Sequence, residues 1–139
     1  MADKSVLTIS IVTPDGERYN RQDVKMIVLD TKSGQLGIMP DHAPIIASLE
    51  VNEVKVEYDG KTDKVAVNGG FVEFSHNVAT IVANSAEKQS DINVPRAQRA
   101  QKRAQANIKK AKAAHDKETL DAEELALRRA INRIYVAKH

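Results

Sequence analysis

The 139-residue chain contains no cysteine and no tryptophan, and its aromatic residues are limited to three tyrosines and two phenylalanines. Without cysteine it has no disulfide framework, no thiolate zinc site and no catalytic thiol. Its unbroken apolar runs extend over only a few residues, far fewer than the roughly 20 needed to cross a bilayer. The first ten residues lack the pattern of a secretory signal peptide. We therefore expect a soluble intracellular protein without a membrane span.

Glycine and charge are unevenly distributed along the chain. All six glycines lie at or before Gly70, whereas 11 of the final 53 residues are alanine. Residues 1–86 carry 8 basic and 12 acidic residues, and residues 87–139 carry 13 basic and 7 acidic residues. This contrast predicts two domains, residues 1–86 and residues 87–139.

The first of these parts has the pattern of a β-sheet domain. Apolar and polar residues alternate through residues 6–84, as in strands with one buried face. Turn signals separate the segments, and Asp59-Gly60 is the strongest hairpin signal among them. Eight to ten short strands at even spacing favour a sandwich or a flattened barrel.

The stretch from Ser33 to Pro44 departs from this alternation, with two glycines and two prolines in twelve residues. Two interpretations fit the composition. The stretch is either a corner where the chain crosses between sheets, or an exposed binding loop on a rigid scaffold.

The second part has the pattern of two helices. Asn93 is a suitable cap and Pro95 is tolerated in a first turn, which predicts a helix through Ala114. Residues 115–117 interrupt the pattern, and a second helix is expected from about Thr119 to Ala137. The first helix offers a thin stripe of Ala97, Ala100, Ala104, Ile108 and Ala111, and the second a stripe of Leu120, Leu127, Ile131 and Ile134. Alanine buries little surface, so the pair is either a detachable element or an ordinary hairpin packed permanently on the sheet domain.

Positive charge is concentrated on the first of these helices. Between Ile92 and His115 there is no acidic residue and there are seven basic ones: Arg96, Arg99, Lys102, Arg103, Lys109, Lys110 and Lys112. Because like charges on one helix repel, this excess predicts a polyanionic partner, either an acidic protein surface, a nucleotide phosphate or nucleic acid. In a folded hairpin, the arginines that would converge on a phosphate are Arg96, Arg103, Arg129 and Arg133.

No catalytic motif is present. The sequence contains no phosphate-binding GxxxxGK[ST] loop, no GxGxxG, no HExxH and no GxSxG. The four histidines are scattered without metal-like spacing. The sequence therefore predicts no catalytic residue and no metal site, and turnover by the isolated chain would contradict this prediction.

Three stretches together resemble one protein family. They are Gly34-Gln-Leu-Gly-Ile-Met-Pro-Asp-His-Ala-Pro44, Val67-Asn-Gly-Gly-Phe-Val-Glu73 and Leu125-Ala-Leu-Arg-Arg-Ala-Ile-Asn-Arg133. Their order and spacing resemble the epsilon subunits of bacterial F-type ATP synthases over essentially the whole chain. The resemblance implies an α+β fold, in which an N-terminal ten-stranded antiparallel β-sandwich is followed by a C-terminal two-helix antiparallel hairpin.

The resemblance also implies a role. Members are non-catalytic rotor subunits of the central stalk, bound to the gamma subunit and to the ring of c subunits. They are peripheral at the cytoplasmic face of the cell membrane, couple proton-driven rotation to catalysis, and restrain ATP hydrolysis. The implied loop residues that dock on the ring and gamma are Ser33, Gln35, Leu36, Ile38, Met39 and His42.

In this family the helical hairpin switches between a compact and an extended form. The resemblance implies that the extended form presents a basic face to acidic segments of the alpha and beta subunits in the catalytic head. The residues of this face are Arg99, Lys102, Lys109, Lys110 and Lys112.

Some members bind ATP in the compact hairpin through an Ile-Asp-x-x-Arg-Ala motif, which reads Ile92-Asn-Val-Pro-Arg96-Ala97 here. Asn93 removes a charge and Pro95 removes an amide, so we expect weaker binding or an altered nucleotide preference. No cofactor is required, and ATP would be regulatory. The matching positions are Glu87, Ile92, Asn93, Arg96, Ala97, Arg103, Arg129 and Arg133.

The competing prediction is a basic helical hairpin that binds nucleic acid, carried on a β-sandwich. A balance of +6 over residues 87–139 suits a phosphate backbone. However, no aromatic residue between Asp91 and Ile134 is available to stack on bases. Nucleic acid is therefore not the expected partner.

Overall fold

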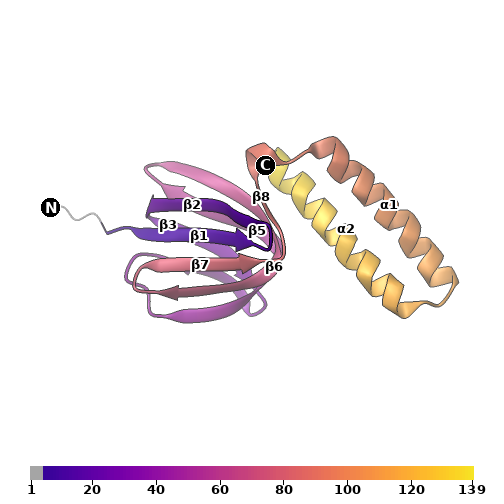
Figure 1. Cartoon of the computed structure of the whole chain (residues 1–139), viewed down its shortest axis with the longest axis horizontal. Helices are drawn as coiled ribbons and strands as arrows, with labels where there is room; N and C mark the ends of the chain where they lie inside the picture. The colour runs from indigo at the N-terminus through magenta and orange to yellow at the C-terminus, as the bar shows by residue number, and fades with distance from the viewer. Residues whose placement is uncertain (1–4) are drawn as a thin grey trace. The chain divides into compact units, whose positions relative to one another are not determined.

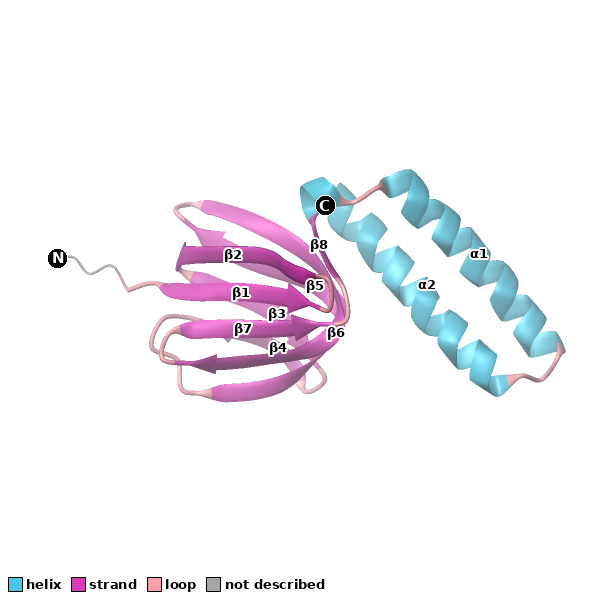
Figure 2. Cartoon of the chain, in the orientation of Figure 1, coloured by secondary structure: helices cyan, strands magenta, loops and turns pink. Residues whose placement is uncertain are grey.

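The computed structural model describes residues 5–139, which form two compact units, residues 5–89 and residues 90–139 (Figure 1). Strands make up the first unit and two helices dominate the second (Figure 2). The division follows Gln89, three residues beyond the position expected from the sequence. The reason is that Ala86–Lys88 forms a short strand, β8, paired with β6 of the sheet.

The first unit is a β-sandwich of eight strands, so the expected fold class is confirmed but the expected count of ten is wrong within the described residues. The strand order is β2-β1-β7-β6-β5-β3-β4, with β8 attached to β6. Strands β1 and β7 pair in parallel, so the sheet is not wholly antiparallel. The bounds are β1 (Leu7–Thr13), β2 (Gly16–Val24), β3 (Met26–Thr31), β4 (Gly34–Ile38), β5 (Ile45–Tyr58), β6 (Lys61–Ser75), β7 (Val78–Ala83) and β8 (Ala86–Lys88).

The count differs because β5 and β6 run for 14 and 15 residues without interruption. Strand β6 continues through Gly69 and Gly70, which adopt φ angles of 79° and 128° that only glycine adopts easily. Before these glycines β6 pairs with β8, and from Gly70 onward it pairs with β7. The two glycines are therefore the point where one strand changes neighbours, not a turn between two strands.

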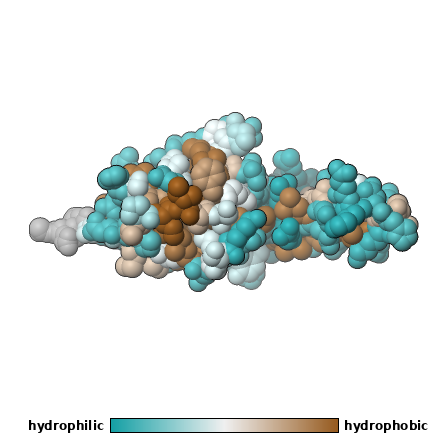
Figure 3. Space-filling view, turned by 90° about the horizontal axis from the view of Figure 1, so that it is seen from below, coloured by the Kyte–Doolittle hydropathy of each residue, from teal (hydrophilic) through white to brown (hydrophobic). Residues whose placement is uncertain are grey.

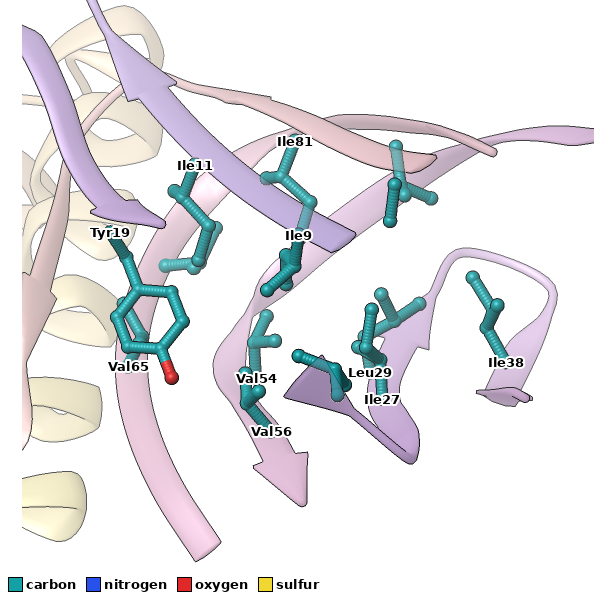
Figure 4. Packing of buried hydrophobic residues seen from close by; sticks show 14 of the residues in the cluster. Ile9, Ile11, Tyr19, Ile27, Leu29, Ile38, Val54, Val56, Val65 and Ile81 are labelled. Atoms are coloured by element: carbon teal, nitrogen blue, oxygen red, sulfur yellow. The ribbon is translucent and has the colours of Figure 1, made fainter. Parts of the chain in front are cut away.

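The alternating apolar residues of the first unit form one interior. Figure 4 shows side chains from β1 to β7 directed into it, including Ile9, Ile27 and Ile81, none of which is accessible to solvent. Because every strand from β1 to β8 contributes to this cluster, the sandwich is a well-packed scaffold on which surface loops are held in fixed positions.

One polar network ties β2 to the hairpin between β5 and β6. The carboxylate of Asp63 accepts hydrogen bonds from the hydroxyls of Tyr19 (2.8 Å) and Tyr58 (2.9 Å). The Arg21 guanidinium lies 3.3 Å above the Tyr58 ring and forms an ion pair with Asp23 (2.7 Å). Burial, aided by Asp63, raises the pKa of Tyr19, so its hydroxyl stays protonated and donates. This network is structural.

The second unit is an antiparallel helical hairpin, as expected. A short 3-10 turn (Gln89–Asp91) precedes α1 (Val94–Ala113), and α2 spans Lys117–Lys138. The Asn93 side chain accepts from the Arg96 amide (3.1 Å) and caps α1. Helix α2 begins before the expected Thr119 because Asp116 is its cap, accepting from the Thr119 amide (3.1 Å) and hydroxyl (2.7 Å). These hydrogen bonds lower the pKa of Asp116.

On the α1 side, the seam between the helices is lined with alanine. On α1 the buried residues are Ala97, Ala104 and Ala111, at seven-residue spacing. On α2 the buried residues are Ala130, Asn132 and Val136, whereas Ile131 is 46% exposed, so the expected place of Ile131 in the buried stripe is wrong. Across the seam, Asn107 Nδ2 donates a hydrogen bond to Glu123 Oε1 (3.0 Å). Alanine offers few methylenes to bury, so packing between the helices contributes little stability.

Candidate functional site

Among residues 5–139, neither helix is long and apolar enough to cross a membrane, and no three histidine or carboxylate side chains are grouped to hold a metal ion. The features that stand out are binding surfaces: an apolar face and a clamped loop on the sandwich, and a basic face on the hairpin.

The apolar face is built from neighbouring strands of the sandwich. Phe71 on β6 is 45% exposed and lies opposite Val82 on β7, which in turn lies opposite Val12 on β1. Val78 on β7 and Ile46 on β5 are also exposed, Ile46 by 75%. Figure 3 shows apolar side chains gathered at the surface of this unit. Scattered exposed apolar residues are normal, but a cluster on adjacent strands marks an interaction surface.

Sequence reasoning missed this face, although a signal was present. Phe71, Val78 and Val82 are apolar residues out of phase with the buried alternation of Val72, Phe74 and Ile81. A strand with apolar residues in both phases has two apolar faces, and only one of them can point into this core.

The expected docking stretch from Ser33 to Pro44 is not a single loop. A turn at residues 32–33 leads into β4, and the loop proper covers residues 39–44. The expected docking residues therefore lie at two ends of a five-residue strand about 17 Å long. Ser33 and Gln35 are exposed near one end, Met39 (57% exposed) and half-buried His42 lie at the other, Leu36 packs against the core and Ile38 is completely buried.

Burial of Ile38 means that it anchors the loop and is not available for contact with a partner. The loop that follows turns tightly, because the His42 amide donates to the Met39 carbonyl (3.1 Å). The His42 ring stands edge-on to buried Phe74, with 6.0 Å between ring centroids. Met39 is thus held outward on a fixed backbone.

The basic face of the hairpin is fully exposed. All seven basic side chains of α1 are open to solvent, and none forms an ion pair with another residue in the range 5–139. Seven positive charges on 20 residues, with no acidic residue on the same helix, leave a positive potential along α1. The expected members of this face, all exposed, are Arg99, Lys102, Lys109, Lys110 and Lys112.

The expected ATP-binding residues are divided between the two units. Glu87 lies in β8, and the other positions lie in the helical unit. The buried methyl group of Ala97 is not open to a ligand, and the Asn93 side chain is engaged in capping α1. Ile92 and Asn93 lie before α1. Arg96 and Arg103 are exposed on α1, and Arg129 and Arg133 are half-buried on α2.

The four arginines expected to hold a phosphate lie at two levels along the hairpin, because Arg96 and Arg103 are seven residues, about 10 Å, apart on α1. Because Asn107 is opposite Glu123, the antiparallel arrangement sets Arg96 near the level of Arg133. Arg129 carries a further signal: its Nε is buried and has no hydrogen-bond partner among residues 5–139. Buried polar groups are normally satisfied, so an unpaired guanidinium nitrogen is a candidate anion contact.

Two family models match the chain in succession. The beta-sandwich domain of the ATP synthase delta/epsilon chain matches residues 6–89, and the long alpha-helix domain of the same chain matches residues 90–138. A curated relative from Levilactobacillus brevis, the ATP synthase epsilon chain, is 62% identical, and the comparison covers all of both chains.

Two solved structures share the fold. A chain of the Euglena gracilis mitochondrial ATP synthase (OSCP/F1/c-ring) has a TM-score of 0.79 at 21% identity and covers 100% of this chain and 85% of its own. A chain of the Tetrahymena thermophila mitochondrial ATP synthase central stalk and c-ring has a TM-score of 0.53 at 16% identity, over 66% of this chain and 73% of its own. By these models and relatives, the chain belongs to the ATP synthase delta/epsilon chain family, as a non-catalytic epsilon subunit of the F-type enzyme.

Proposed function

We propose that this chain is a central-stalk rotor subunit that docks through its β-sandwich on the gamma subunit and the c-subunit ring, and restrains ATP hydrolysis through its helical hairpin. In this role it is peripheral, at the cytoplasmic face of the cell membrane, and couples proton-driven rotation to catalysis elsewhere in the complex. The observation that carries the proposal is the combination of an exposed apolar face on a rigid sandwich with an unneutralised basic helix in a weakly packed hairpin.

The apolar face supports the contact with gamma. Phe71, Val82 and Ile46 lie on three different strands of one packed sheet, so their relative positions are fixed before binding. Burial of a preorganised apolar cluster gains free energy without the cost of ordering loops. Phe71, the single aromatic of this face, is the natural anchor of such an interface.

Replacing Phe71 with glutamate is expected to weaken binding to gamma by about 30-fold or more, because aromatic anchors typically contribute at least about 2 kcal/mol. Binding of the full-length variant to purified gamma is measured by calorimetry. The matched control is Thr62→Glu, which adds the same charge at an exposed position in the β5–β6 hairpin. Equal loss of affinity in both variants, or no loss in either, would rule out this face as the contact.

The hairpin supports the inhibitory role. Its alanine seam holds the two helices together weakly, whereas α1 consists almost entirely of strong helix formers and so remains helical when released from α2. In the extended form its basic face would meet acidic segments of the alpha and beta subunits in the catalytic head. The exposed basic side chains of α1 form no ion pairs within the described residues, so they favour binding to an acidic surface. Helix α1 has no aromatic residue to stack on bases, so nucleic acid is not proposed.

We extend the proposal to ATP as a regulatory ligand of the compact hairpin, held by Arg96, Arg103 and Arg129. Calorimetric titration of the full chain is expected to give a dissociation constant near the millimolar range, because Asn93 is neutral where the family motif has aspartate. Arg96→Ala is expected to weaken binding by more than about tenfold, the usual effect of losing a charge-assisted contact. Asn93→Asp, which retains the cap of α1, is the control and is expected to bind more tightly. No heat at millimolar ATP in any variant would exclude the site.

A further inference from the structure

Two residues far apart in the sequence fasten the docking loop to a neighbouring turn. The Asp41 amide donates to Asn77 Oδ1 (2.6 Å), and Asn77 Nδ2 donates to Asp41 Oδ1 (3.0 Å). Asp41 lies in the loop of residues 39–44, and Asn77 lies in the turn between β6 and β7. Asn77 is itself fixed, because its carbonyl accepts from the amide of Thr8 in β1 (2.9 Å).

The backbone on both sides of this contact is in an unusual conformation. Asp41 has φ of 68° and Asn77 has φ of 59°, and the preceding His76 has φ of 50°. Asparagine and aspartate tolerate this left-handed region better than other residues with a side chain. Both positions therefore need a residue type that adopts the conformation and also supplies the hydrogen bond.

This contact completes the anchoring of the loop. Buried Ile38 holds its start, the edge of the His42 ring meets Phe74, and the Asp41–Asn77 pair holds its middle. Exposed Met39 is carried on this fixed backbone. A flexible thioether on a rigid loop adapts to a partner surface while the backbone loses little entropy on binding.

We infer that Asn77 is a positioning residue of the docking loop, and that residues 39–44 and 76–77 form one composite contact surface for the c-subunit ring. The inference rests on the proposed docking of the sandwich on that ring. It adds a turn that lies more than 30 residues downstream of the loop. Asn77 acts through Asp41 and need not touch the ring.

A double-mutant cycle that exchanges the side chains of Asp41 and Asn77 tests this role. Asn77→Asp removes the donated hydrogen bond and sets two carboxylates against each other, so the full chain is expected to bind the solubilised assembly of gamma and c-ring about tenfold more weakly. Asp41→Asn keeps both hydrogen bonds, since an amide oxygen also accepts. In the double variant D41N/N77D, the side-chain amide of residue 41 donates to the carboxylate of residue 77, so both hydrogen bonds are present with donor and acceptor side chains exchanged. The affinity is therefore expected to return to the Asp41→Asn value. Because the double variant and Asp41→Asn both lack the Asp41 carboxylate, comparing their affinities removes the effect of any direct contact between Asp41 and the ring.

A second measurement separates this inference from the proposed function. Amide hydrogen exchange at residue 41 of the free chain is expected to be faster in Asn77→Asp and restored in D41N/N77D. Binding of Asn77→Asp equal to wild type, or failure of the double variant to recover, would overturn the inference while docking stands. Absence of binding by the wild-type chain would overturn the docking proposal itself.

Asn77→Gly, which keeps the positive φ but loses both side-chain hydrogen bonds, replaces Asn77→Asp if that variant does not fold. Its affinity is expected to fall by a similar factor, and wild-type affinity would overturn the inference.

Discussion

Gly70→Ala is expected to prevent the β-sandwich from folding stably. A Cβ at this position would lie 2.0 Å from the Val82 carbonyl oxygen and 2.8 Å from the Ala83 Cα, both of them backbone atoms. The φ of 128° is in addition strained for any residue with a side chain. Relief requires that β6 and β7 separate where Gly70 pairs with Ala83. We expect a loss of about 4 kcal/mol or more in the free energy of unfolding, most of the stability of a domain of this size.

The matched control for this substitution is Gly37→Ala. A Cβ at Gly37 has open space within 4 Å and no positive φ, so the free energy of unfolding is expected to change by less than about 1 kcal/mol. Urea unfolding of the full chain, followed by circular dichroism, compares the two variants. Equal unfolding midpoints for Gly70→Ala and Gly37→Ala would contradict the assigned role of Gly70.

Ending the chain at Gln89 is expected to raise ATP hydrolysis by the assembled complex about fivefold or more, equivalent to removing about 1 kcal/mol of the barrier. The truncation deletes α1 and α2 with their charge surplus but retains β8, which completes the sheet through its pairing with β6. Ending the chain at Ala86 instead would remove most of β8 and confuse loss of inhibition with damage to the sandwich. Retained binding of the truncated chain to gamma is therefore the control.

Charge neutralisation tests whether the basic face causes the restraint. Replacing Arg99, Lys102 and Lys109 with glutamine keeps helix propensity high while removing three exposed positive charges. Hydrolysis with this variant is expected to lie between the rates of the wild-type and truncated complexes. Unchanged inhibition would mean that the hairpin acts through a surface other than its basic face.

Much of the fold follows from local rules in the sequence. The period of two placed Leu7, Ile9 and Ile11 on one inward face of a strand, and the structure buries all three. Asn93 and the break after Ala114 located α1 to within about two residues, because capping depends on a few neighbouring groups.

What the sequence did not predict depends on contacts between distant residues. Gly69-Gly70 has the composition of a turn, and only the pairing of β6 with two different neighbours makes it a bend within a strand. In the hairpin Ala130 is buried and Ile131 is exposed, although hydrophobicity alone favours burial of the isoleucine. The Asp41–Asn77 contact joins residues 36 positions apart, and no local pattern encodes it.

The measurement that tests the central claim most directly is ATP hydrolysis by a complex whose hairpin is locked shut. Because the chain has no cysteine, one engineered pair joining α1 to α2 at the level of Asn107 and Glu123 forms the only disulfide within this subunit. The account predicts that the oxidised complex hydrolyses ATP as fast as the complex truncated after Gln89, and that reduction of the same sample restores inhibition. Inhibition as strong in the oxidised as in the reduced complex would contradict it.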